Sequence, residues 1–215
     1  MDAASYDLAM VYQDSSIVVV NKPGGILSVP GRGPDKQDCI VSRLRRRFPG
    51  CISQPSVHRL DMDTSGLMVL ALTSEAHQHL SEQFRNRTVK KQYLAMLDGI
   101  VAEEQGEIRL PFRLDIDNRP YQIHDPVHGK WGITIWRRQA IEGRQTRVRF
   151  TPITGRTHQL RVHASHFLGL GCPIVGDRLY GTGKPGDRLL LHASFLSFAH
   201  PASHTTLCFE SSPMF

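Results

Sequence analysis

The sequence predicts an α+β protein, built as a single catalytic domain with a large mixed, mainly antiparallel sheet flanked by short helices and loops. Three observations lead to this class: strand-like segments outnumber helix-like ones, their connections are short and irregular, and no linker, repeat or low-complexity tract divides the chain. The 215 residues, 40% hydrophobic and 21% charged, are enough to bury a core and resemble an average globular protein.

The first part of the chain contains two predicted buried strands and two predicted helices. Residues 17–20 and 67–72 are continuous apolar runs, as in strands that are covered on both faces. Residues 39–48 and 74–87 have apolar side chains four positions apart, which predicts helices with one buried face. The first of these helices carries a run of basic residues, which we expect on its solvated sides: Arg43, Arg45, Arg46 and Arg47.

Strands dominate the rest of the prediction. Residues 89–97 form a strand with Tyr93 in its middle, and residues 99–144 mix Pro, Gly and Asn with short β-like runs, which favours meandering antiparallel strands. Residues 147–150 alternate basic and apolar side chains, as a half-exposed strand does, and residues 189–198 form another strand.

One helix is expected in this second part, over residues 156–164. Its apolar positions Leu160, Ala164, Phe167 and Leu168 would point inward, with a glycine ending the helix soon afterwards. Arg161 would then lie off the apolar face.

Charge, hydropathy and cysteine content indicate the partners and the cellular location of the protein. A net charge of +6 and a pI near 9.4 favour polyanionic partners such as nucleic acid. No apolar run approaches the roughly 20 residues that cross a bilayer, and the first residues lack the features of a signal peptide, so we expect a cytoplasmic protein that does not bind membranes. Four cysteines without metal-binding spacing are expected to be reduced and mostly buried: Cys39, Cys51, Cys172 and Cys208.

The densest polar cluster next to a predicted core strand is His58-Arg59-Leu60-Asp61-Met62-Asp63-Thr64-Ser65-Gly66. Considered alone, a single aspartate in such a cluster is more typical of a capped turn, in which Asp61 or Asp63 binds neighbouring amides. A Mg²⁺-dependent phosphatase loop of the form D-x-D-x-T is a second interpretation of Asp61 to Thr64. Such a loop follows its hydrophobic strand, whereas here the apolar strand comes afterwards, so the order argues against a phosphatase.

These residues match the H-R-L-D-x-x-T-S-G motif of the RluA-type family of RNA pseudouridine synthases, which the chain resembles. Further blocks of that family follow the same order along the chain: Asn21-Lys22-Pro23, Lys91-Gln92-Tyr93-Leu94-Ala95, Thr154 to His163, Gly176 to Gly181 and Leu189 to Ala193. The resemblance covers about residues 11 to 201. Several ordered blocks at long range make it far more specific than any one of them.

The resemblance implies the pseudouridine synthase fold and a reaction that converts uridine in RNA to pseudouridine. Within the family, the chain is most similar to the short member that acts on both 23S ribosomal RNA and a tRNA anticodon stem-loop. We further expect one catalytic domain over residues 1–215 without an S4-like RNA-binding module, no cofactor and no metal. We expect a monomer, because RNA surrounds such an active site and no predicted amphipathic helix lacks a core partner. Trp131 and Trp136 depart from the family, in which Pro or Ala and Tyr are expected.

The resemblance also assigns roles to four residues. Asp61 is the nucleophile, and Arg161 is the arginine that pairs with it, since a cation beside a buried carboxylate favours the ionised form. Tyr93 stacks on the target base or takes part in proton transfer. Arg59 enters the helix stack when the uridine is flipped out, offsetting part of the flipping cost of a few kcal/mol.

Two alternatives remain open from the residues themselves. A non-catalytic RNA-binding protein would show the same basic charge, and it is distinguished by having no turnover that depends on Asp61. The histidines could suggest a metal site, but they lack ligand spacing, and structural or RNA-contacting roles are favoured for His58, His158, His163, His166 and His192.

Overall fold

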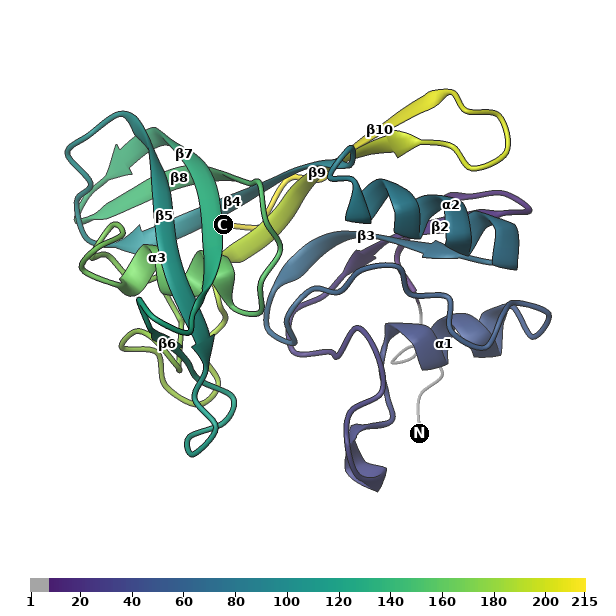
Figure 1. Ribbon diagram of the computed structural model, residues 1–215, viewed down its shortest axis with the longest axis horizontal. Coiled ribbons are helices and arrows are strands. Elements are labelled where there is room, and N and C mark those ends of the chain that lie inside the picture. The colour runs from purple at the N-terminus through teal and green to yellow at the C-terminus, as the bar shows by residue number, and fades with distance from the viewer. Residues whose placement is uncertain (1–7) are drawn as a thin grey trace. The chain divides into compact units, whose positions relative to one another are not determined.

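The computed structural model describes residues 8–215 (Figure 1). Its strands make up a mixed, mainly antiparallel sheet with a few short helices, which confirms the predicted fold class. The chain divides into two compact units. The first unit contains the chain up to Lys91 together with His192–Met214, and the second contains Gln92–Leu191 and Phe215.

In the part of the first unit that the structure describes, five strands follow the order β1-β2-β3-β9-β10. Its elements are β1 (Met10–Gln13), β2 (Ile17–Lys22), a 3-10 turn (Pro34–Lys36), α1 (Ile40–Arg47), β3 (Ser65–Ala71), α2 (Ser74–Arg85), β9 (Leu191–Ala199) and β10 (Thr206–Glu210). Among these strands β3 and β9 are parallel, and the other pairs are antiparallel.

The two continuous apolar runs form the centre of this unit, as predicted. All seven residues of β3 are buried, and Val69 of β3 lies opposite Val19 of β2. Helix α2 packs against β3 through its apolar stripe, of which Ala76 and Leu80 are buried. Strand β2 continues to Lys22, two residues beyond the apolar run.

Helix α1 confirms the predicted helix, but one of its arginines is not solvated. The helix begins with a capping box in which the Cys39 Sγ accepts from the Ser42 amide and the Ser42 hydroxyl accepts from the Cys39 amide. Arg43 is only 8% exposed because both carboxylate oxygens of Asp38 accept hydrogen bonds from its guanidinium, at 2.9 and 2.6 Å. The expectation that all four arginines lie on solvated faces is therefore wrong for Arg43.

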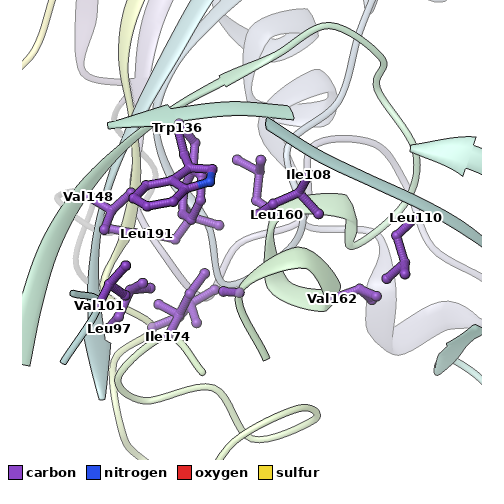
Figure 2. Close-up of a cluster of buried hydrophobic side chains, with 14 of the residues drawn as sticks. Leu97, Val101, Ile108, Leu110, Trp136, Val148, Leu160, Val162, Ile174 and Leu191 are labelled. Atoms are coloured by element: carbon purple, nitrogen blue, oxygen red, sulfur yellow. The ribbon is translucent and has the colours of Figure 1, made fainter. Parts of the chain in front are cut away.

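The second unit contains the predicted meander, with strand order β4-β8-β7-β5-β6 and antiparallel pairing throughout. Its elements are β4 (Lys90–Asp98), β5 (Gln105–Leu114), β6 (Gln122–His124), β7 (Lys130–Glu142), β8 (Gln145–Pro152) and α3 (Gln159–Ser165). Figure 2 shows its core, a cluster of buried side chains that includes Trp136 and Val148 of the strands and Leu160 and Val162 of α3.

Helix α3 is shorter than the sequence predicts. It begins at Gln159, after His158 in a left-handed conformation with φ of 55°, and it ends at Ser165. Leu160 and Ala164 are buried as expected, but Phe167 and Leu168 are 80% and 53% exposed. The helical periodicity that would turn them inward no longer applies after Ser165, so that part of the prediction is wrong.

The cysteines agree with the sequence in their chemistry and only partly in their burial. All four thiols are free. Cys39 is buried, Cys51 and Cys172 are half-buried and Cys208 is exposed, so the expectation of mostly buried cysteines is wrong. Within residues 8–215, no helix is long and apolar enough to cross a lipid bilayer.

Candidate active site

The polar motif of residues 58–64 forms a loop that leads directly into β3. Leu60 and Thr64 are buried within it, at 6% and 2% exposure, while Asp61 is half-buried and Arg59 is exposed. The Asp61 carbonyl accepts a hydrogen bond from the Thr64 amide at 3.2 Å, which closes a turn around the two acidic residues. The loop thus buries Leu60 and Thr64 and leaves Asp61 partly exposed and Arg59 exposed.

His58 attaches the start of this loop to the core of the first unit. Its Nε2 accepts the backbone N–H of Val69 in β3 at 3.1 Å, and its ring stacks on Phe84 of α2 with centroids 4.5 Å apart. Burial lowers the pKa of His58 to about 3, and the positive charge of Lys91 contributes. The ring is therefore neutral at pH 7, as an acceptor nitrogen must be.

Lys22 binds the backbone of this loop at Met62. Its ammonium is fully buried and donates to the carbonyls of Pro23, Ile26 and Met62, at 2.9, 2.7 and 2.8 Å. Burial lowers the pKa of Lys22 to about 8, while the carboxylates of Asp63 and Asp61 act in the opposite direction. An ammonium has three donors, and here each one has a carbonyl acceptor.

A chain of hydrogen bonds, buried at Ser65 and His192 and partly buried beyond them, joins four distant segments at the end of this loop. The Ser65 hydroxyl contacts His192 Nδ1 at 2.9 Å, His192 Nε2 contacts the Ser211 hydroxyl at 3.0 Å, and that hydroxyl accepts from the Asn21 side chain at 3.0 Å. Gly66 follows at φ of 114°, where a Cβ would lie 2.4 Å from the Ala193 carbonyl oxygen. Three of the blocks recognised in the sequence therefore meet in one polar network.

The second unit contains Arg161 in a buried ion pair. Its Nε and one terminal nitrogen donate to the two carboxylate oxygens of Asp177, at 2.8 and 2.6 Å, and both side chains are at most 3% exposed. Burial alone would raise the pKa of Asp177, but the guanidinium and the amides of Tyr180 and Leu179 outweigh it and hold that pKa below its usual range. Arg161 also lies over the Tyr180 ring, 5.4 Å from its centroid.

Tyr93 lies in β4, half-buried, on the face of the strand that carries the core of the second unit. Its register partner in β8 is Phe150, which is fully buried. The ring is thus fixed by packing on one side and retains exposed surface, a placement compatible with stacking on a flat aromatic ligand.

The predicted site residues are thus distributed over both units. Asp61 and Arg59 share one loop of the first unit, and Tyr93 and Arg161 belong to the second. The pairing of Arg161 with Asp61 stays a prediction. Arg161, which we expect off the apolar face of its helix, is not part of the hydrophobic core cluster, but it is buried in the ion pair with Asp177.

Sequence reasoning missed two supporting residues, Lys22 and Asp177. Both belong to blocks that the motif comparison singled out, but their partners are distant in sequence: Met62 lies 40 residues from Lys22, and Arg161 lies 16 residues from Asp177. Of the two atypical tryptophans, Trp136 is buried in the second core and Trp131 is 56% exposed. In residues 8–215, no group of three or more His, Cys, Asp or Glu side chains is arranged to hold a metal ion.

Comparison with known proteins identifies the family. The model of a family described as RNA pseudouridylate synthase matches residues 16–166. The chain is 43% identical to the dual-specificity RNA pseudouridine synthase RluA of Haemophilus ducreyi, over 97% of this chain and 94% of that protein. It is 42% identical to the protein of the same name from Escherichia coli K12, over 95% and 92% of the two chains.

Solved structures agree with these relatives. Human RNA pseudouridylate synthase domain containing 1 has a TM-score of 0.76 and 29% identity, covering 99% of this chain and 86% of its own. Human RNA pseudouridylate synthase domain containing 4 has a TM-score of 0.74 and 26% identity, covering 96% and 89%.

The chain therefore belongs to the RNA pseudouridylate synthase family. It is an enzyme of the RluA type, an isomerase that converts uridine to pseudouridine in RNA. The interpretations as a non-catalytic RNA-binding protein and as a phosphatase are not favoured.

Proposed function

We propose that Asp61 is the nucleophile of this isomerase and that its substrates are uridines in structured RNA, in 23S ribosomal RNA and in a tRNA anticodon stem-loop. The proposal for two RNA classes is supported by the relatives above, which are named as dual-specificity enzymes. The two units together act as one catalytic domain over residues 1–215.

The reaction breaks the N1–C1′ glycosidic bond, rotates the base and joins C5 to C1′. The proton on C5 is lost to solvent and N1 gains one, so the atoms balance without an oxidant or an energy source. A carboxylate suits this isomerisation because it can add to an electron-poor carbon, hold that fragment while the other one turns, and leave again. We therefore propose that the enzyme needs no cofactor and no metal, and that it acts as a monomer.

The other three residues supply binding and charge. Arg59 is exposed beside Asp61, so its planar guanidinium can fill the space that a flipped uridine leaves in the stack and contact phosphate. Tyr93 stacks on the target base and can take part in proton transfer. Arg161 supplies a positive charge for Asp61, and Asp177 orients that guanidinium through the bidentate pair.

One observation carries the assignment of Asp61: this partly exposed aspartate lies on a loop whose backbone is anchored by His58 and Lys22. A fixed nucleophile of this kind is what a covalent mechanism requires, because small displacements from the reacting atom are costly. Lys22 donates to three backbone carbonyls and His58 Nε2 accepts from the Val69 amide, so both anchors act on the backbone of the loop and not on the carboxylate.

The test measures tritium release from RNA labelled with [5-³H]uridine, with EDTA present throughout. We expect release by the wild type and none by Asp61→Asn, which should still bind the RNA. Asp63→Asn is the matched control, because it removes a half-buried carboxylate from the same loop, and it should keep most of the turnover. Full activity of Asp61→Asn, or dependence of the wild type on a metal, would contradict the proposal.

A further inference from the structure

One side chain holds both peptide groups of the residue that precedes Asp61. The Ser28 hydroxyl donates to the Leu60 carbonyl at 2.7 Å and accepts from the Leu60 amide at 3.0 Å. Ser28 and Leu60 are 3% and 6% exposed, so water does not compete easily for these bonds. A hydroxyl can donate once and accept as well, which an alanine in this place cannot do.

Ser28 is itself fixed by the beginning of α1. Its carbonyl accepts from the Val41 amide at 3.2 Å, and the neighbouring Leu27 carbonyl accepts from the Ile40 amide at 2.9 Å. These are two of the first amides of the helix, which have no partner inside it. Hydrogen bonds from the first turn of α1 therefore fix the backbone of Ser28, and with it the position of the Ser28 hydroxyl.

The residue after Asp61 is held from the same segment. The Met62 carbonyl accepts from Lys22 Nζ at 2.8 Å and from the Gly25 amide at 2.9 Å. Backbone groups on both sides of Asp61 are thus attached to residues 22–28, before Asp61 by Ser28 and after it by Lys22 and Gly25.

We propose that Ser28 is a positioning residue for the Asp61 carboxylate, acting through the Leu60 peptide groups. This inference rests on the proposed role of Asp61 as nucleophile. The hydroxyl restricts the backbone torsions next to Asp61, so that the carboxylate meets the reacting carbon in a narrow range of positions. Loss of this restraint lowers the rate of the chemical step more than the affinity for RNA, because Ser28 is buried and does not reach the substrate.

The test compares wild type, Ser28→Ala and Ser28→Cys in steady-state tritium release from transcribed ribosomal RNA and tRNA. We expect kcat of Ser28→Ala to fall by about 10- to 100-fold with KM changed by less than about 2-fold. Ser28→Cys keeps the volume and a weak donor and acceptor, so its kcat should lie between the other two. Ser197→Ala is the matched control, since Ser197 is a buried serine of the same unit that bonds Cys208; its kcat should equal that of the wild type.

A second measurement tests the hydrogen bonds between Ser28 and Leu60 directly and does not depend on enzyme activity. Hydrogen exchange of the Leu60 amide, observed by NMR, should be about 10-fold faster in Ser28→Ala and unchanged in Ser197→Ala. Unchanged exchange at Leu60, an unchanged kcat, or an equal loss of kcat in Ser197→Ala would each overturn the inference. If the wild type released no tritium while exchange at Leu60 responded as expected, the proposed function would be refuted and the restraint alone would stand.

Discussion

The Nε2 of His58 accepts a hydrogen bond from the backbone N–H of Val69 at 3.1 Å. This bond attaches the first residue of the H-R-L-D motif to the middle of the fully buried strand β3. Only a neutral ring with its proton on Nδ1 has a free lone pair for it. The loop that carries Asp61 therefore depends on one protonation state of one histidine.

The stability of the protein should decrease in mild acid because of His58. Its pKa is about 3 in the folded protein and near the ordinary 6.5 after unfolding, so unfolding takes up a proton between these values. The contribution of His58 is complete above pH 6.5 and declines as the pH falls towards 3. Urea denaturation at pH 7.5 and pH 5 should show a larger loss for the wild type than for His58→Gln, which keeps an acceptor and does not titrate. An equal loss in both proteins would contradict this assignment.

Neutralising Asp177 should be costly for stability. Asp177→Asn leaves the guanidinium of Arg161 buried beside a neutral amide, and breaking a buried pair in this way typically costs about 3–5 kcal/mol. Urea denaturation measures the change in the free energy of unfolding. The control is Glu107→Gln, since Glu107 pairs with Arg109 and both side chains are exposed, at 45% and 64%, and we expect a much smaller loss there. Similar losses in both variants would show that the burial of the pair does not matter.

Local patterns predicted the elements of this fold well, while long-range partners could not be predicted. The apolar run of residues 67–72 became the buried strand β3, because a strand covered on both faces has no polar alternation. Periodicity also found α1, but it could not show that Arg43 is buried, since that depends on the upstream Asp38. Periodicity wrongly placed Phe167 in the core, because it could not predict that α3 ends at Ser165.

In the site, too, local motifs could be predicted from the sequence, whereas long-range contacts could not. The motif located Asp61 and Arg59 from adjacent residues alone. The residues that hold the Asp61 loop, Lys22 and Ser28, lie more than 30 residues earlier in the chain and contact backbone atoms, which have no sequence signature. A fully buried lysine after an apolar run is indistinguishable in sequence from one that ends a strand at the surface.

Replacing Gly66 should destabilise the first unit strongly. A Cβ at this position would lie 2.4 Å from the Ala193 carbonyl oxygen and 2.5 Å from its nitrogen, and φ is 114°. Both atoms belong to the backbone of β9, so they cannot move aside as a flexible side chain would. We expect Gly66→Ala to cost more than about 3 kcal/mol or to prevent folding, as measured by thermal and urea denaturation.

Comparing Gly25→Ala with Gly66→Ala separates the cost of a strained backbone from the cost of steric overlap. Gly25 has a φ of 84°, but no atom lies within 4 Å of the added Cβ. Its cost should be limited to the left-handed conformation, about 1–2 kcal/mol. A loss in Gly25→Ala as large as that in Gly66→Ala would show that the close contact with Ala193 is not the reason for the glycine.

Arg59 should matter for turnover and little for folding, because its side chain is exposed while its neighbour Leu60 is buried. A guanidinium that replaces the flipped uridine in the stack offsets part of a cost of a few kcal/mol, so Arg59→Ala should lower kcat/KM by about 10- to 100-fold. Its free energy of unfolding should stay within about 0.5 kcal/mol of the wild type. Arg144→Ala is the control, since it removes the same charge from an exposed position in the turn between β7 and β8. If both variants lose the same activity, and raising the salt concentration reduces the difference from wild type equally in both, then Arg59 contributes only general attraction to RNA.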